Sequence, residues 1–147
     1  MRIAIGCDHA GLALKAMLAT GLAAAGHAVE DVGTVSEASV DYVDFGAGVA
    51  RMVRDGACDR GILVCGTGQG MAMTANKHRG VRASLCHDPV SARFARLHND
   101  ANVLALGARI IGPELAREVV RVWLATPYEG GRHDRRLAKL KAIEEGQ

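Results

Sequence analysis

Two segments of the sequence combine residues that can move protons with backbone that can approach an anion closely. The first is Cys65-Gly66-Thr67-Gly68-Gln69-Gly70, where glycines at alternate positions follow an apolar run. Because glycine has no side chain, its amides can come close to an anion or a developing oxyanion. The second is His98-Asn99-Asp100, whose histidine can act as an acid or a base near neutral pH. Together the two segments predict proton-transfer or nucleophilic chemistry beside an anion-binding loop.

Cys65 is the candidate base or nucleophile of the first segment. It ends the apolar run just before a predicted helix N-terminus, where the helix dipole favours a thiolate. The alternative is a small buried hydrophobic residue, which is the commoner role of a lone cysteine and our interpretation of Cys7, Cys58 and Cys86. The four cysteines form no C-x-x-C pair, so we expect reduced thiols rather than disulfides or a zinc site.

The glycine-rich segment does not match the common nucleotide-binding motifs. A Walker loop would continue as G-K-[ST], and the fingerprint G-x-G-x-x-G fails because Met71 stands at the third glycine position. A nucleotide cofactor is therefore disfavoured. The remaining alternative is a turn that only allows a strand and a helix to pack tightly, but three glycines exceed what such packing requires.

Among the other histidines, His9 is the best candidate for chemistry because it adjoins Asp8 after a short apolar run. A lone histidine is more often solvated or part of a cap, and His27, His78 and His133 have no comparable context. The sequence contains no H-x-x-x-H or H-E-x-x-H spacing, so it predicts no metal site.

A pair of arginines near the C-terminus is a candidate anion site. Arg132 and Arg136 are four residues apart, so on a helix they would share one face and could bind one phosphate together. The alternative is a solvated basic face, the usual role of a charged run such as Arg132 to Lys141.

The elements that must position these residues alternate along the chain between short apolar runs and longer segments of helical period. This alternation predicts successive βα units and a parallel sheet. Strands are expected at Arg2–Gly6, His27–Val32, Gly61–Cys65, Arg82–Cys86 and Val103–Leu106. Helices are expected at Leu12–Ala25, between an Asp41 cap and Gly56, from Pro89 towards His98, from Pro113 to near Pro127, and at Arg132–Glu145.

Ligands of open parallel sheets bind outside the carboxyl ends of the strands. The polar residues that follow predicted strands are therefore expected to share one crevice; they are Asp8, His9, Cys65 to Gly70, His87, Asp88 and Arg109.

Composition excludes several classes of protein. The chain has 147 residues, a net charge of +2 and 49% apolar residues, which fits one folded domain and does not indicate a nucleic-acid binder. The longest uncharged stretch, Gly61 to Asn76, has 16 residues, short of the ~20 that span a bilayer. The apolar run Ile3 to Cys7 is too short for a secretory signal, so we expect a cytoplasmic protein.

Taken together, the motifs resemble the ribose-5-phosphate isomerase B family, which also includes allose-6-phosphate and galactose-6-phosphate isomerases. The resemblance rests on motifs that occur in the family's order from the first strand to the final helix: Gly6-Cys7-Asp8-His9-Ala10-Gly11, Cys65-Gly66-Thr67-Gly68-Gln69-Gly70, Ala75-Asn76-Lys77, His98-Asn99-Asp100-Ala101-Asn102 and Gly130-Gly131-Arg132-His133.

The resemblance implies interconversion of ribose 5-phosphate and ribulose 5-phosphate, a reaction of the pentose phosphate pathway, without metal or organic cofactor. Cys65 is similar to the base that moves a proton between C1 and C2, while the amides of Gly66 to Gly70 stabilise the enediolate. His98 is similar to the residue that opens the furanose ring, with Asp8 and Thr67 close to the sugar oxygens. Some members use a glutamate where this chain has Met71, so the chain follows the cysteine branch.

The resemblance also assigns the substrate-binding residues and an assembly. The family's phosphate-binding residues correspond to His9, Arg132 and Arg136. Its remaining sugar contacts correspond to Asn99 and Arg109. Family members are homodimers, sometimes paired into tetramers, whose active sites combine residues of two subunits. No nucleic acid or membrane partner is implied.

The fold that the resemblance implies is α/β: a three-layer α/β/α sandwich around a five-stranded, parallel, Rossmann-like sheet in the order 2-1-3-5-4. It would be a single domain over residues 1–147, with a C-terminal helix at about 132–145.

Two other classes of function stay open. A non-catalytic sugar-phosphate or nucleotide-binding module would need the glycine loop and the arginines but no titrating thiol. A redox or thiol-transfer protein would use Cys65, although no resolving cysteine lies nearby in the sequence.

Overall fold

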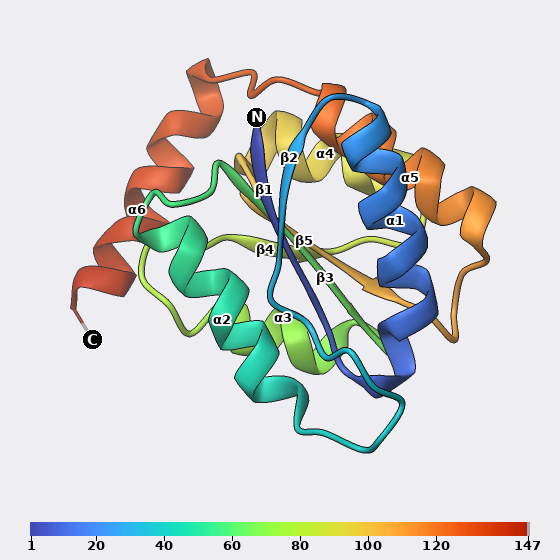
Figure 1. Ribbon diagram of the computed structural model, residues 1–147. Helices are drawn as coiled ribbons and strands as arrows, with labels where there is room; N and C mark the ends of the chain where they lie inside the picture. The colour runs from blue at the N-terminus through green and yellow to red at the C-terminus, as the bar shows by residue number, and fades with distance from the viewer. Residues whose placement is uncertain (147) are drawn as a thin grey trace.

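A five-stranded parallel sheet forms the centre of the computed structural model, which describes residues 1–146 (Figure 1). Every pair of neighbouring strands is parallel, and the order is β2-β1-β3-β5-β4. The strands are β1 (Arg2–Cys7), β2 (Ala28–Asp31), β3 (Arg60–Cys65), β4 (Ala83–Leu85) and β5 (Val103–Gly107). The α/β class and the strand order implied by the family resemblance are therefore confirmed.

Helices cover both faces of the sheet and make the expected three layers (Figure 1). One outer layer holds α1 (Leu12–Ala24), α4 (Pro89–Asn99) and α5 (Pro113–Ala125). The other holds α2 (Tyr42–Arg54) and α3 (Gln69–Ala75). Two 3-10 turns, η1 (His9–Gly11) and η2 (Gly131–His133), precede α1 and the last helix, α6 (Asp134–Glu145).

Alternation of side chains along β3 shows how one strand serves two cores. Ile62 and Val64 point into the core under α1, α4 and α5, which also contains the buried Trp123. Leu63 and Cys65 point the other way, into the core under α2 and α3. Because a parallel strand in the middle of such a sandwich is buried on both faces, its sequence is apolar throughout. This arrangement places the sulfur of Cys65 on the α3 side of the sheet.

The ends of several elements differ from those expected from the sequence. The two edge strands, β2 and β4, are shorter than expected, because each can form a ladder with only one neighbour. Asp88 caps α4 through its side chain as expected, whereas Asp41 stands at the N-cap of α2 without a side-chain cap hydrogen bond. The terminal α-helix begins at Asp134 rather than Arg132, because Gly130 and Gly131, with φ of 70° and 60°, lead into a 3-10 turn.

The last helix, α6, stands outside both helical layers, at the left of Figure 1. None of its residues is buried. Its apolar side chains Leu140 and Ile143 are 46% and 63% exposed. A carboxylate of α6 ties it to the rest of the chain, because Glu144 accepts a hydrogen bond from the Gly80 amide at 3.1 Å. Among residues 1–146, no helix has the length and apolar character needed to cross a membrane.

Candidate active site

The carboxyl ends of β1, β3 and β5 bring together one group of the residues singled out by the sequence. β1 leads to Asp8 and His9, β3 ends at Cys65, and β5 leads to Arg109. The strands run in parallel register, with Cys7 opposite Val64 and Cys65 opposite Gly107. These side chains therefore lie along one edge of the sheet, as the strand-end argument predicts, and we call them the carboxyl-edge group.

Cys65 lies at the bottom of the glycine loop and is 5% exposed. Its Sγ accepts a hydrogen bond from the Gly68 amide at 3.1 Å. An amide donor and the start of α3 thus place partial positive charge next to the sulfur. The family resemblance implied that the amides of Gly66 to Gly70 all stabilise the enediolate. In this structure the Gly68 amide serves the sulfur, and the amides of Gly66, Thr67 and Gly70 are the candidates for the oxyanion.

Gly68 is required by both its backbone angle and its surroundings. Its φ is +78°, a conformation that side chains rarely adopt. A Cβ atom there would lie 2.9 Å from the carbonyl carbon of Leu106 and 2.4 Å from a methyl group of Leu85. The loop therefore packs directly on β5, which supports the packing interpretation of this glycine alongside the chemical one.

Tyr42 covers the far end of the loop, a feature that the sequence analysis missed. A Cβ atom on Gly70 would lie 2.6 Å from the ring of Tyr42, so this glycine allows close approach of an aromatic face. The ring belongs to the first residue of α2 and is 41% exposed. The only sequence signal was a tyrosine among five aromatic residues.

The Asp8-His9 pair is held by the turn that follows β1. Asp8 is buried, and its Oδ1 accepts hydrogen bonds from the amides of Ala10 and Gly11 at 3.0 and 3.1 Å. His9 Nδ1 accepts a hydrogen bond from the Val40 amide at 3.3 Å. With Nδ1 acting as the acceptor, the Nε2 atom of His9 is the one that carries a proton and can donate to an anion.

Arg109 and His87 close the other side of the loop. Arg109 donates its amide to the Gly66 carbonyl at 3.0 Å, and a Cβ atom on Gly66 would lie 3.5 Å from the guanidinium. His87 follows β4, and its Nε2 accepts a hydrogen bond from the Gly107 amide at 2.9 Å. His87 was expected at this edge without a role, and its hydrogen bond holds the end of β5.

The remaining candidates lie elsewhere, around the last turn of α4 and the start of α6. His98 and Asn99 end α4, and Arg132 lies in η2. The Nη1 atom of Arg136 donates to the Arg132 carbonyl at 3.3 Å, so the two arginines lie one turn apart, as their spacing predicts. We call His98, Asn99, Arg132 and Arg136 the amino-edge group, because α4 ends near the start of β5.

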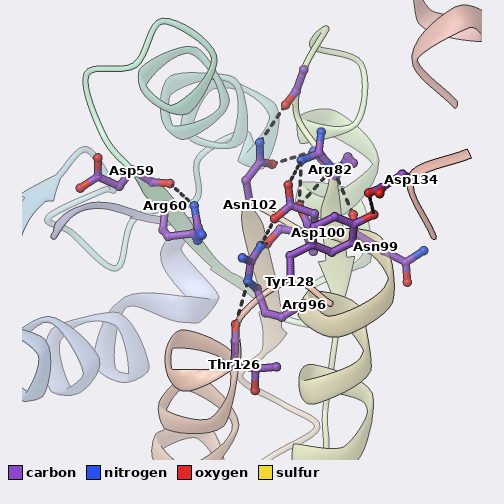
Figure 2. Close-up of polar contacts among 12 residues, drawn as sticks. Asp59, Arg60, Arg82, Arg96, Asn99, Asp100, Asn102, Thr126, Tyr128 and Asp134 are labelled. Carbon is purple, nitrogen blue, oxygen red and sulfur yellow. Dashed lines mark hydrogen bonds and ion pairs between the residues drawn. The ribbon is translucent and has the colours of Figure 1, made fainter. Parts of the chain in front are cut away.

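An ion-pair network fixes the chain just after His98 and Asn99 (Figure 2). Asp100 has a φ of +44° and pairs with Arg96 and Arg82, each at 2.8 Å. Arg82 also donates to the carbonyl of Asn99 at 3.1 Å, and Arg96 donates to the carbonyl of Ala101 at 2.7 Å. Two guanidinium groups thus satisfy the free carbonyls at the end of the helix, which makes this turn a rigid support.

One chain keeps the two groups apart. The five residues of β5, at ~3.3 Å each, separate the two edges of the sheet by roughly 15 Å. The expectation of one crevice concerned only residues that follow strands, and the carboxyl-edge group lies along one edge of the sheet. The amino-edge group, which that expectation did not include, lies at the opposite edge. The reason is topological: α4 starts at the carboxyl edge and runs back to the amino edge before β5 begins.

One basic and one acidic residue beside His98, His133 and Glu129, were not among the predicted site residues. The ring of His133 stacks on that of His98 with centroids 4.3 Å apart, and Glu129 pairs with His133 at 3.1 Å. His133 belongs to the quoted motif Gly130-Gly131-Arg132-His133, yet its own spacing gave no hint of a histidine pair.

The other three cysteines are buried and unpaired, as expected. Burial raises the pKa of Cys7 to about 11, and it also raises the pKa values of Cys58 and Cys86. These thiols therefore stay protonated near neutral pH, which agrees with their interpretation as small buried hydrophobic residues.

Both the sequence and the structure of the chain are similar to those of sugar-phosphate isomerases. A family model described as Ribose/Galactose Isomerase matches residues 3–140. The chain is 47% identical to ribose-5-phosphate isomerase B of Escherichia coli over 98% of this chain and 97% of the relative. It is 44% identical to D-erythrulose-4-phosphate isomerase of Pectobacterium atrosepticum, over 98% and 95% of the two chains. The solved structure of ribose-5-phosphate isomerase B from Clostridium thermocellum superposes with a TM-score of 0.98 at 49% identity, covering 99% of both chains. The chain therefore belongs to the ribose/galactose isomerase family.

Proposed function

We propose that this chain is an aldose–ketose isomerase that interconverts D-ribose 5-phosphate and D-ribulose 5-phosphate through an enediolate. The observation that carries the proposal is the Cys65 sulfur, held at a strand end with an amide donor at 3.1 Å and a glycine loop around it. Relatives named as isomerases of five-carbon and four-carbon sugar phosphates support this substrate class.

In the proposed reaction His98 first opens the furanose ring. The proton on the C1 hydroxyl leaves to the histidine, the C1–O4 bond breaks as the aldehyde forms, and O4 takes up a proton. Cys65 then removes the proton from C2, which leaves negative charge on the C1 oxygen of the enediolate. That oxygen takes the proton of the C2 hydroxyl, and Cys65 returns its proton to C1. Amides of the glycine loop stabilise the negative charge that develops on the enediolate oxygen, an effect worth ~3 to 4 kcal/mol per donor.

The other candidate residues bind the sugar phosphate. We assign the phosphate to the Nε2 atom of His9 and to the guanidinium groups of Arg132 and Arg136. The sugar oxygens are contacted in this proposal by Asp8, Thr67, Asn99 and Arg109. Gln69 belongs to the glycine loop that surrounds the sugar. The phosphate is remote from the reacting carbons, so its binding energy can orient the substrate. The assignment requires no metal or organic cofactor.

The proposal requires a homodimer, because one chain places the two groups at opposite edges of its sheet. In a two-fold dimer the amino-edge group of one subunit can meet the carboxyl-edge group of the other. The uncovered α6, with Leu140 and Ile143 exposed, supplies an apolar surface for a second copy. Pairing of dimers into a tetramer would leave this shared site unchanged. Four buried, unpaired cysteines fit a reducing compartment, and we place the enzyme in the cytoplasm.

An isomerase assay across ribose 5-phosphate, allose 6-phosphate and galactose 6-phosphate tests the proposal, with Cys65→Ala as the control. We expect turnover of ribose 5-phosphate that disappears in the variant while ligand binding is retained. Binding without turnover in the unaltered protein would instead indicate a non-catalytic binding module.

A further inference from the structure

The ring of His98 contacts two other rings. Phe94, one helical turn earlier, lies with its ring centroid 4.7 Å away, and His133 stacks on His98 at 4.3 Å with an interplanar angle of 16°. The Glu129 carboxylate lies beside both imidazoles. Its Oε2 is 3.1 Å from the Nε2 atom of His133 and 3.9 Å from that of His98. These side chains form a cluster around a residue to which the proposed function gives the ring-opening step.

The backbone ties this cluster to the helix that carries His98. The Glu129 amide donates to the carbonyl of Leu97, the residue before His98, at 3.0 Å. The amide of His133 donates to the Gly130 carbonyl at 3.2 Å, and the His133 side chain is buried. The segment after α5 therefore follows the last turn of α4 and cannot shift without moving the histidine stack.

A metal ion is the first alternative use of these three side chains. Two histidines and a carboxylate match the ligand types of zinc sites, and one ligand atom from each lies within 4.8 Å of the others. However, the nearly parallel rings direct their nitrogen lone pairs side by side rather than towards one point. Arg132 Nε also lies 3.4 Å from the Nε2 atom of His133, so a cation there would meet a guanidinium. The geometry favours a role without a metal.

We propose that Glu129 and His133 are positioning residues for His98 in opening the sugar ring, an inference that rests on the proposed function. The side chain of His98 is 31% exposed at a helix end, where an unsupported ring would rotate freely. Stacking on His133 restricts that rotation. The Glu129 carboxylate orients the pair and stabilises the positive charge that His98 gains when it takes the proton of the C1 hydroxyl.

A double-mutant cycle tests whether Glu129 acts through His98. The four proteins are the unaltered chain, Glu129→Gln, His98→Ala and the double variant, all assayed with ribose 5-phosphate. We expect Glu129→Gln to lower kcat about tenfold with little change in KM. The loss is smaller than the ~10²- to 10⁴-fold contribution of general acid–base catalysis, because His98 itself remains. In the His98→Ala background the same substitution should have no further effect. Equal losses in both backgrounds would overturn the inference.

A substrate that cannot cyclise gives a second, independent readout. D-erythrose 4-phosphate carries its phosphate on the C4 oxygen, so it forms no furanose and needs no ring opening. Glu129→Gln and His133→Asn should turn it over at the rate of the unaltered enzyme. A loss on this substrate as large as that on ribose 5-phosphate would show a merely structural role.

A control variant and His98→Ala together separate the ring-opening role of His98 from the positioning role of Glu129 and His133. Glu118→Gln removes an exposed carboxylate of α5 that pairs with Arg121 away from the stack, and it should leave both activities unchanged. If His98→Ala retains full ribose 5-phosphate turnover, the ring-opening role in the proposed function is wrong. If His98→Ala loses turnover but Glu129→Gln and His133→Asn do not, only the positioning inference is wrong.

Discussion

Cys65 and His98 lie at opposite edges of the parallel sheet of one chain. Cys65 stands opposite Gly107 at the carboxyl end of β5, whereas His98 lies five residues before Val103, where that strand begins. A small sugar phosphate cannot contact both in one chain. The proposed catalytic pair must therefore come from two subunits.

This separation predicts complementation between two inactive variants. His98→Ala and Cys65→Ala proteins, mixed under conditions that exchange subunits, should regain activity. A heterodimer would carry both lesions in one site and neither in the other. Random pairing makes half of the dimers heterodimers, so activity should approach roughly a quarter of the unaltered level by the symmetry of a two-fold dimer. Verified heterodimers without activity would show that each chain builds its catalytic pair alone.

Cys65→Ser should lose most of kcat with little change in substrate affinity. A hydroxyl at the strand end is a far poorer base than a thiolate, whereas the loop amides that bind the sugar stay in place. Steady-state kinetics combined with ligand binding by calorimetry measure the two effects separately. Turnover near that of the unaltered enzyme would refute the assignment of the base.

Replacing Arg132 or Arg136 by alanine should weaken binding of substrate and of inorganic phosphate together. Both ligands would lose charge-assisted hydrogen bonds to the same guanidinium groups. Arg135→Ala is the matched control, because this exposed arginine lies between them in the sequence. If phosphate inhibits all three variants equally, Arg132 and Arg136 do not bind phosphate and belong to a solvated basic face.

Gly68→Ala should destabilise the protein more than Gly26→Ala does. Both glycines have positive φ, 78° and 84°, so both substitutions carry the strain of that conformation, about 1 kcal/mol. Only at Gly68 would the new Cβ atom also meet backbone, 2.9 Å from the carbonyl carbon of Leu106. Urea unfolding measures the difference, and kcat should fall only in Gly68→Ala, because its amide holds the Cys65 sulfur. Equal unfolding free energies in the two variants would contradict the packing argument.

Burial of Cys7 makes stability depend on pH in the alkaline range. The pKa of this thiol is raised to about 11 in the folded protein from the ordinary value of 9.0, chiefly because burial disfavours the thiolate. The unfolded chain therefore loses this proton first as the pH rises. The stabilisation is fully present below pH 9 and is lost as the pH approaches 11, by about 2 kcal/mol of unfolding free energy.

Cys7→Ala tests the sign of this effect. The variant should be less stable at pH 8 because it leaves a cavity, but its unfolding free energy should fall less between pH 8.5 and pH 11. Parallel pH profiles for the two proteins would show that another group causes the alkaline loss.

The sequence alone determined the class of fold and half of the candidate site. Apolar runs that alternate with helical periods predicted the parallel sheet, and strand ends predicted that Asp8, Cys65 and Arg109 would share an edge. These features depend on local burial and on the direction of each strand. Both properties can be inferred from the spacing of apolar and polar residues along the chain. The family resemblance supplied the strand order, which the periodicity of the sequence does not contain.

The tertiary structure decided which residues of distant segments meet. It placed the ring of Tyr42 on Gly70, stacked His133 on His98, and put the amino-edge group at the far end of the sheet from Cys65. Spacing within one element reports which of its faces is buried, but not which other element covers that face. The stack of His98 and His133 depends on the packing of the segment after α5 against the end of α4. That packing is set by contacts between parts of the chain more than 30 residues apart, which no local pattern encodes.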